Sequence, residues 1–254
     1  MAKILMHKGK KIDIEGREKT LYKPRSYYVR KMDQDMHVEE GAIKKEDFLK
    51  NKITTNKGIE FACFDATALD DMTHVKRGAQ VITPKDAGII LAETGLTKES
   101  VIVEAGSGSG SLTCFLARLI KHVYSYDINQ EHFDIAKQNI KDLKIDNVTF
   151  KLQDVSEKID QEDVDAVILD MPEPWTCIET AKKAVKVGGF IVAYVPSTTQ
   201  IQQFCNQIHA DDDLYWIKTV EIIARKWKVK GKAVRPVSQG LGHTAFLTFV
   251  RRLY

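Results

Sequence analysis

The sequence of 254 residues predicts an α/β fold in which a doubly wound, mostly parallel sheet follows a small β-rich segment. Three observations support this prediction. A β-branched run, a glycine-rich turn and a helical stripe follow one another over residues 101–120. Strand-like and helical segments then alternate up to residue 209, which indicates parallel strands joined by right-handed crossovers. Residues 1–75, by contrast, contain short strand-like runs separated by glycines.

We therefore expect two domains, a small β-rich domain over residues 1–75 and a Rossmann-like α/β domain over residues 76–254. In the first domain we expect at most one short helix, near residues 46–50, and a linker that begins near Asp70. Basic side chains alternate with tyrosines there: Lys8, Lys10, Lys11, Lys23, Arg25, Arg30 and Lys31 with Tyr22, Tyr27 and Tyr28. This combination suits phosphates and unstacked bases. A solvated β surface accounts for the same pattern equally well.

The α/β domain is expected to begin with a helix that precedes its first strand. Pro84 lies where the first helical turn would take it, Asp86 follows, and an apolar stripe ends before Gly95. Because this segment comes directly before the first strand, we expect it to lie over a ligand cleft.

The turn after the first strand has the composition of a ligand-binding loop. Gly106, Gly108 and Gly110 alternate with serines, and such glycines allow positive φ angles and a close approach to a ligand. A dinucleotide fingerprint needs G-x-G-x-x-G, whereas the third glycine here comes one residue early. A tight strand–helix connection without a ligand is the alternative. The next strand ends at Asp127, where a carboxylate can accept both ribose hydroxyls of an adenosyl ligand.

The remaining elements place further acids at strand ends. We predict strands over 148–152, 165–169 and 190–195 and helices over 130–144, 176–185 and 199–209. Asp154 and Asp170 follow the first two of these strands, so they should meet Asp127 at the carboxyl edge of the sheet, where ligands bind. Two long strands, 216–224 and 245–251, have no helical pattern between them and should form an antiparallel hairpin at the edge.

The segment Asp170-Met171-Pro172-Glu173-Pro174-Trp175 is the sharpest local signal. Two prolines prevent both helix and ladder continuation, so the chain should form a rigid, extended ledge after Asp170. A rigid backbone beside a carboxylate can grip a planar, amine-bearing ring. The structural alternative is an Asp-initiated turn with a packed tryptophan.

Composition limits the partners and the compartment. The net charge of +3 is mild, so a polyanion must be met by local basic clusters. Four cysteines lack C-x-x-C spacing, which predicts reduced thiols and no metal site: Cys63, Cys114, Cys177 and Cys205. No apolar run approaches the roughly 18 residues of a membrane span, and no apolar signal core opens the chain. We therefore expect a cytoplasmic protein without a membrane partner.

Taken together, these motifs resemble the tRNA (adenine-N1) methyltransferase family, in its archaeal and bacterial homo-oligomeric form that acts on T-loop adenosine 58. The glycine turn resembles motif I of class I S-adenosyl-L-methionine (AdoMet) methyltransferases. The resemblance covers nearly the whole chain and includes Gln80-Val81-Ile82 with Pro84-Lys85-Asp86, the DMPEPW ledge, Arg235-Pro236 and Gly242-His243-Thr244. Many methyltransferases share the glycine turn, whereas its combination with the ledge and the C-terminal elements is specific.

The resemblance implies a tetramer of identical subunits, an N-terminal domain for tRNA docking or oligomer contacts, and methyl transfer from AdoMet to N1 of adenosine 58, with position 57 left open. It implies that Asp170 is catalytic. The implied cofactor contacts are Gln80, Ile82, Glu104, Gly106, Gly108, Ser109, Gly110, Ser111, Leu112, Asp127, Ile128, His132, Asp154, Val155 and Asp170. The implied substrate contacts are Thr83, Pro172, Pro174, Trp175, Arg235 and His243. Thr83 stands where relatives often carry Tyr or His, and His132 where some carry Arg.

The chemistry agrees with these assignments. Adenine N1 has a free lone pair at neutral pH, so it needs in-line placement rather than a general base. As N1 is methylated the ring becomes cationic, and a carboxylate at Asp170 that accepts from N6 would bind the transition state better than the ground state. A T-loop base must first be extruded from its stack. Phosphate contacts are expected from Lys8, Lys10, Lys11 and Arg25 and from a second basic cluster: Arg225, Lys226, Lys228, Lys230, Lys232 and Arg235. For the second cluster, a solvated, lysine-rich edge hairpin accounts for the pattern at least as well.

Three other functions remain open from the sequence. A protein isoaspartyl-type methyltransferase shares the glycine turn, but its carboxylate substrate would be repelled by Asp170. A small-molecule methyltransferase has no need of the N-terminal domain. A non-catalytic tRNA-binding subunit would be expected to lose the glycines and acids that are all present here.

Overall fold

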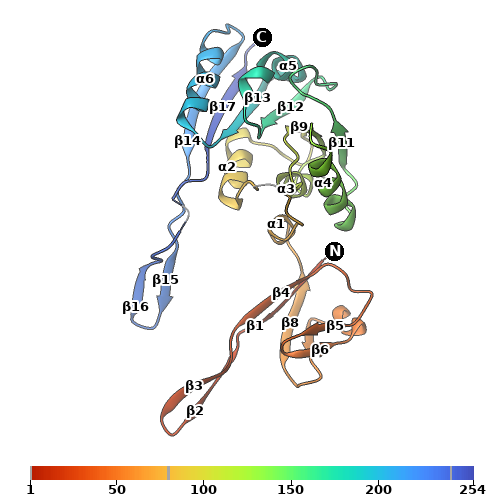
Figure 1. The fold of residues 1–254 in the computed structure, drawn as a ribbon, viewed down its shortest axis with the longest axis vertical. Coiled ribbons are helices and arrows are strands. Elements are labelled where there is room, and N and C mark those ends of the chain that lie inside the picture. The colour runs from red at the N-terminus through yellow and green to blue at the C-terminus, as the bar shows by residue number, and fades with distance from the viewer. Residues whose placement is uncertain (1, 79–80, 241) are drawn as a thin grey trace. The chain divides into compact units, whose positions relative to one another are not determined.

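The computed structural model describes residues 2–78, 81–240 and 242–254, and the chain divides into two compact units (Figure 1). The first unit comprises residues 1–74 together with 142–144, and the second comprises residues 75–141 and 145–254. Among the described residues, no helix is long and apolar enough to cross a membrane.

The first unit is built from antiparallel strands, as the sequence predicts. Its main sheet has the order β4-β1-β8-β7, with bounds Arg25–Val29, Lys3–His7, Glu60–Asp65 and Lys52–Thr54. Two further ribbons are formed by β2 (Lys10–Ile14) with β3 (Arg17–Tyr22) and by β5 (Met36–Val38) with β6 (Gly41–Ile43). Alternate residues of these strands, such as Leu5 and Phe61, are buried in a small core of their own.

Two details of this unit differ from the expectation. The short helix near residues 46–50 is a 3₁₀ turn, Lys45–Leu49, whose Phe48 is buried in the core. The linker expected near Asp70 is instead a helix, α1 (Ala68–Thr73). Thr67 and Asp70 form a reciprocal capping box that starts this helix, and Met72 is buried, so local capping and burial together order the segment.

The second unit confirms the predicted α/β fold, with a mostly parallel sheet in the order β11-β10-β9-β12-β13-β17-β14. The bounds in that order are Val148–Leu152, His122–Asp127, Val101–Ala105, Val164–Leu169, Val185–Val195, Phe246–Arg252 and Leu214–Glu221. The strand order reverses between β9 and β12, which is the switch point where such sheets bind ligands. The glycine turn follows β9 and Asp170 follows β12, so both flank this point.

Helices cover the sheet on both faces. They are α2 (Pro84–Thr94), α3 (Ser111–Ala117), α4 (Gln130–Asp142), α5 (Ile178–Ala184) and α6 (Thr198–His209), with a 3₁₀ turn over Pro174–Cys177. Val103 and Val167 point to one face, in a core cluster that includes Phe204 of α6. Their neighbours Ile102 and Ile168 point to the opposite face and are equally buried, which explains the continuous apolar runs of these strands.

The C-terminal region contains a hairpin that the sequence did not predict as a separate element. β14 and β17 pair antiparallel at the edge of the sheet as expected. The connection between them forms its own two-stranded ribbon, β15 (Trp227–Lys230) with β16 (Ala233–Pro236), labelled in Figure 1. We call this ribbon the basic hairpin. All four residues of β15 are exposed, and an isolated ribbon of this kind is only marginally stable in water.

Candidate functional site

The glycine turn between β9 and α3 brings the backbones of two strand ends close together. Gly106 has a φ angle of +93°, and a Cβ atom added there would lie 2.0 Å from the carbonyl oxygen of Asp170. Gly110 has a φ angle of +71° and is the N-cap residue of α3, with a built Cβ only 3.1 Å from Ala136. These glycines are therefore required by close backbone approach as well as by backbone conformation.

The Asp127 carboxylate is fixed at the end of β10 by backbone donors. The amide of Gly108 donates to its Oδ2 at 2.9 Å, and the amide of Asn129 donates to its Oδ1 at 2.9 Å. Each oxygen keeps further acceptor capacity, so the group remains able to accept two ligand hydroxyls. The Nδ1 atom of His132 lies 3.8 Å from Oδ2. The geometry fits a ribose anchor.

A second carboxyl, that of Glu104, lies buried beneath the turn. Thr113 and Ser125 donate their hydroxyl hydrogen bonds to its Oε2 atom. Burial raises the pKa of Glu104 to about 7, and these two hydrogen bonds oppose the shift. Glu104 is only 1% exposed, so it supports the turn from below and does not reach a ligand directly without rearrangement.

Asp170 begins the predicted ledge after β12. Its amide donates to the carbonyl oxygen of Ala105 at 2.8 Å, which continues the β9–β12 ladder. The ledge is held from α6, because the Gln200 side-chain amide donates to the carbonyl oxygen of Pro172 at 2.8 Å. Burial raises the pKa of Asp170 to about 7, and the nearby charges of Glu104 and Asp127 add to the effect. Three acids in one place favour a cationic ligand.

The glycine turn, Asp127 and Asp170 contribute to the wall of one cleft of about 680 Å³. The predicted residues on its wall are Gly106, Gly108, Asp127, Ile128, His132, Asp154, Val155, Asp170 and Pro172. A small adjoining hollow shares Gly106, Gly108 and Asp170 and adds the predicted residues Ile82, Glu104, Ser109, Ser111 and Leu112. Gln80 lies outside the described residues. The structure thus brings most of the predicted cofactor contacts together around a single space.

The cleft is also lined by residues that were not predicted, although their position in the chain near the carboxyl ends of strands could have indicated them. Asn129 comes two residues after Asp127, and its side chain accepts from the amide of Glu131 at 2.9 Å, where α4 begins. Met171, Glu173 and Thr176 belong to the ledge and the turn that follows it. Asn129, Met171 and Glu173 lie within four residues of a strand end and Thr176 lies seven residues after one, so their position near the carboxyl edge of the sheet could have indicated them.

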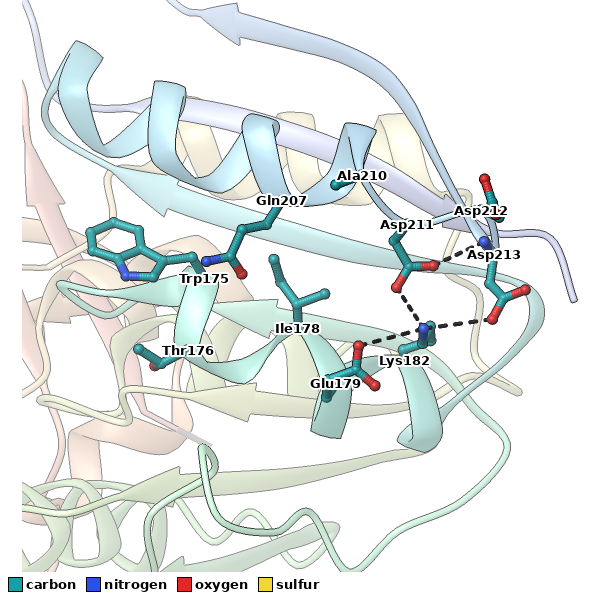
Figure 2. Close-up of a pocket in the computed structure, with 10 residues that line it drawn as sticks. All are labelled: Trp175, Thr176, Ile178, Glu179, Lys182, Gln207, Ala210, Asp211, Asp212 and Asp213. Atoms are coloured by element: carbon teal, nitrogen blue, oxygen red, sulfur yellow. Dashed lines mark hydrogen bonds and ion pairs between the residues drawn. The ribbon is translucent and has the colours of Figure 1, made fainter.

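Several predicted substrate contacts lie elsewhere. Trp175 lines a separate surface pocket of about 580 Å³ between α5 and α6, shown in Figure 2, where Lys182 pairs with Glu179, Asp211 and Asp213. Pro174 is buried at the start of the 3₁₀ turn. Neither side chain is on the wall of the 680 Å³ cleft. Their role in substrate binding stays a prediction.

The other three predicted substrate contacts are held by specific partners or lie on the basic hairpin. The Thr83 hydroxyl donates to Asp86 Oδ2 at 2.7 Å at the start of α2. His243 places Nδ1 2.6 Å from Glu221 Oε1 and Nε2 2.8 Å from the carbonyl oxygen of Pro196. Arg235 is exposed on β16, opposite Lys228 on β15.

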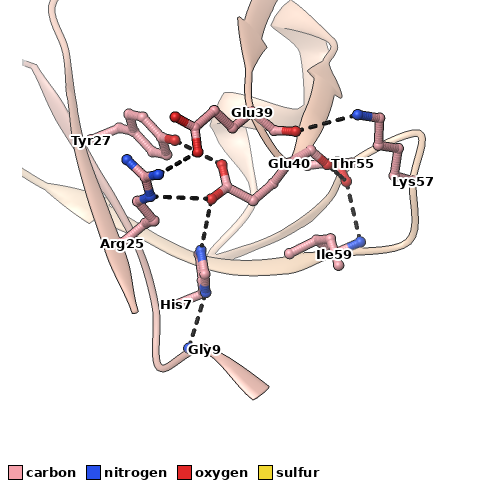
Figure 3. Close-up of polar contacts among 9 residues, drawn as sticks. All are labelled: His7, Gly9, Arg25, Tyr27, Glu39, Glu40, Thr55, Lys57 and Ile59. Atoms are coloured by element: carbon pink, nitrogen blue, oxygen red, sulfur yellow. Dashed lines mark hydrogen bonds and ion pairs between the residues drawn. The ribbon is translucent and has the colours of Figure 1, made fainter. Parts of the chain in front are cut away.

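The basic cluster of the first unit is partly neutralised by acids. In Figure 3, Arg25 contacts Glu39 and also lies 3.7 Å from Glu40, which accepts from Tyr27 at 2.7 Å. Lys11 pairs with Glu18 across the β2–β3 ribbon. Arg25 therefore serves the local polar network of this unit, and its charge is less available to a phosphate than the sequence suggests.

The chain is similar in sequence to known tRNA methyltransferases. A family model described as the tRNA methyltransferase complex GCD14 subunit matches residues 72–235. A Methanocaldococcus jannaschii protein named tRNA (adenine(57)-N(1)/adenine(58)-N(1))-methyltransferase TrmI is 32% identical over 257 residues, covering 89% of this chain and 90% of the relative. The Thermus thermophilus tRNA (adenine(58)-N(1))-methyltransferase TrmI is 32% identical over 225 residues, covering 85% and 88%.

Two solved structures share the fold along almost the whole chain. A SAM-dependent O-methyltransferase from Thermotoga maritima superposes with a TM-score of 0.80 and 27% identity, covering 99% of this chain and 93% of that one. The tRNA (m1A58) methyltransferase TrmI from Aquifex aeolicus superposes with a TM-score of 0.76 and 24% identity, covering 99% and 97%. The likeness to the second structure concerns the fold alone.

Proposed function

The chain belongs to the tRNA methyltransferase family described by the GCD14 model, and on this premise we propose that it transfers the methyl group of AdoMet to N1 of adenosine 58 in the tRNA T-loop. One observation carries the proposal: the glycine turn, Asp127 and Asp170 line a single cleft at the switch point of the sheet. A relative named for positions 57 and 58 and a relative named for position 58 alone are each 32% identical to this chain, so position 58 is the common expectation.

The residues of the cleft fit AdoMet. Gly106 lets the glycine turn approach the Asp170 backbone, which a side chain there would prevent, and Asp127 keeps open acceptors for the ribose hydroxyls. Asp154 and Val155 line the cleft beyond the next strand, β11, on the side suited to the adenine ring. When bound, AdoMet supplies an electrophilic sulfonium methyl group. Its positive charge is complemented by the acidic wall of the cleft, where Asp127 and Asp170 lie.

Asp170 is the proposed catalytic residue. The rigid Pro172 ledge fixes the position of its carboxylate, which would accept a hydrogen bond from N6 of the target adenine. N1 attacks with its own lone pair, and the positive charge that develops on the ring strengthens the N6 donor. A fixed acceptor in a partly buried site then stabilises the transition state more than the ground state. Because only ionised Asp170 acts in this way, the rate should rise with pH near neutrality.

The proposed tRNA contacts centre on the basic hairpin. The register pairs Lys228 with Arg235, so these side chains share one face, and it pairs Val229 with Val234 on the other. Val229 and Val234 are 73% and 60% exposed, and a covering partner would stabilise such an isolated ribbon. We assign the basic face to tRNA phosphates and the apolar face to a second copy of this chain, in keeping with a homotetramer. Residues 1–75 are proposed to contribute further docking contacts.

The test is to incubate the protein with AdoMet and an unmodified tRNA transcript and to map methylated nucleosides by nuclease digestion and mass spectrometry. We expect 1-methyladenosine at position 58 and none in a transcript that carries guanosine there. Methylation of an oxygen atom, the reaction class in the Thermotoga maritima protein's description, or methylation of protein alone, would refute the proposal. Asp127→Ala and Gly108→Val should both weaken AdoMet binding in calorimetric titration, and unchanged affinities would mean that the cofactor site is misplaced.

A further inference from the structure

A buried polar cluster next to the cleft is not accounted for by the proposed mechanism. Asp86 is 0% exposed, and four side chains donate to its carboxylate. Thr83, Thr244 and Tyr194 donate hydroxyl hydrogen bonds to Oδ2 at 2.7, 2.9 and 3.3 Å, and Lys85 donates to Oδ1 at 2.6 Å. Lys85 also donates to the Thr244 hydroxyl oxygen at 2.6 Å. We call these five residues the Asp86 node.

The node joins three elements at the carboxyl edge of the sheet. Thr83, Lys85 and Asp86 belong to the start of α2, next to Ile82 of the small hollow. Tyr194 lies near the end of β13, and the β12–β13 register pairs Leu169 with Ala193. The next residues along these strands are Asp170 and Tyr194, so the node begins one strand away from the proposed catalytic carboxylate. Thr244 comes from the segment just before β17.

That segment is also the root of the basic hairpin, because β15 and β16 lie in the connection between β14 and β17. His243 fixes the root from the outside through Glu221 of β14 and the carbonyl oxygen of Pro196. Both ring nitrogens face acceptor oxygens, an arrangement that favours the protonated ring. Thr244, only 9% exposed, fixes the root from the inside by bridging Lys85 and Asp86.

We propose that Thr244 is a positioning residue for methyl transfer, which links the root of the basic hairpin to the start of α2 and so couples tRNA docking on the hairpin to alignment of the target adenine beside Asp170. This inference rests on the proposed function. The physical reason is that Thr244 both accepts from an ammonium and donates to a fully buried carboxylate, so its hydroxyl has one well-defined orientation. The Thr244 hydroxyl contacts the Asp86 carboxylate of α2 directly.

The test compares Thr244→Val, which removes the hydroxyl at nearly constant shape, with Thr244→Ser, which keeps it. The expected result for Thr244→Val is a single-turnover rate, at saturating AdoMet and tRNA, that falls about 10- to 100-fold, the scale of a small misplacement of reacting groups. AdoMet affinity should be unchanged, and Thr244→Ser should recover most of the rate. Lys85→Gln breaks the same bridge from its other end and serves as the second variant if Thr244→Val folds poorly. It should likewise reduce the single-turnover rate and leave AdoMet affinity unchanged.

A matched control is available on β17, the strand that follows the hairpin root. Thr248 of β17 is 0% exposed and lies 2.9 Å from the Thr219 hydroxyl, so Thr248→Val also removes a buried hydroxyl. It should lower stability without lowering the single-turnover rate. An equal loss of rate in Thr248→Val, or an unchanged rate in both Thr244→Val and Lys85→Gln, would overturn the positioning role.

A double-mutant cycle tests the coupling itself. Arg235→Ala on the hairpin should slow single turnover in the parent but have much less effect in Thr244→Val, because the link is already broken. Additive losses would overturn the coupling. Formation of 1-methyladenosine by the parent is measured first, so a failure of the proposed function is seen there, and a failure of the positioning role is seen in the variants.

Discussion

Asp170→Asn should make the protein more stable at alkaline pH and should remove most of the proposed methyltransferase activity. The pKa of Asp170 is raised from 3.8 to about 7, chiefly by burial. Each unit of difference between the folded-state and unfolded-state pKa corresponds to about 1.36 kcal/mol, so the ionised group lowers the free energy of unfolding by about 4 kcal/mol at most. Because Asp170 keeps partial access to solvent through the cleft, about 2–4 kcal/mol is the working range.

The sign follows from proton binding. Between about pH 4 and pH 7 the folded protein keeps a proton on Asp170 that the unfolded chain releases, so stability falls as pH rises through this window. Asparagine is neutral throughout and avoids the loss. The thermal unfolding midpoint of Asp170→Asn should therefore exceed that of the parent by roughly 4–16 °C at about pH 8, and the gap should close towards about pH 4.

The assay is thermal unfolding of both proteins across this pH range without AdoMet, together with single-turnover rates. The rate should fall about 10²- to 10³-fold, because the amide oxygen accepts from N6 without a negative charge. Asp160→Asn is a control of opposite sign: hydrogen bonds from Lys151 and Lys158 lower the pKa of Asp160 to about 2, so its replacement should lower the midpoint. Equal midpoints for Asp170→Asn and the parent at about pH 8 would refute the reasoning.

Three further predictions concern the turn, the hairpin and its root. Gly106→Ala should abolish AdoMet binding, because the added Cβ would lie 2.0 Å from the carbonyl oxygen of Asp170 in the ledge. Gly188→Ala is the control, since Gly188 has a φ of +77° and nothing lies within 4 Å of the added Cβ. Equal AdoMet affinities of the two variants in calorimetric titration would contradict the steric argument. Lys228→Ala and Arg235→Ala should each flatten the slope of log tRNA affinity against log salt concentration by somewhat less than one unit. Slopes equal to that of the parent would show that the tRNA binds to another surface. The hydrogen bond to its carboxylate partner raises the pKa of His243, so the stability that the charged ring contributes is complete below its ordinary value and is lost as pH rises. The midpoint gap between the parent and His243→Gln should thus narrow as pH rises above about 6, and a constant gap would show that the ring charge is not involved.

The sequence determined the features that depend on local chain properties. The β-branched strand before Gly106, the early third glycine and the acids after each strand predicted both the sheet and the position of its cleft. The parallel topology then determines the position of the acids, because parallel strands have their carboxyl ends at one edge of the sheet. Asp127, Asp154 and Asp170 therefore lie around the same cleft. The two prolines of the ledge act through their own rings, so their effect could also be read locally.

The tertiary structure decided whatever depends on partners distant in the chain. Arg25 looked like a phosphate ligand until the fold placed it beside Glu39, and Trp175 looked like part of the ledge surface although it lines another pocket. Thr244 and Asp86 are separated by 158 positions, so no periodicity or spacing could join them. The physical reason is that hydrogen bonds and ion pairs are satisfied by whichever groups packing brings within about 3 Å, and only the assembled strands and helices determine which groups those are.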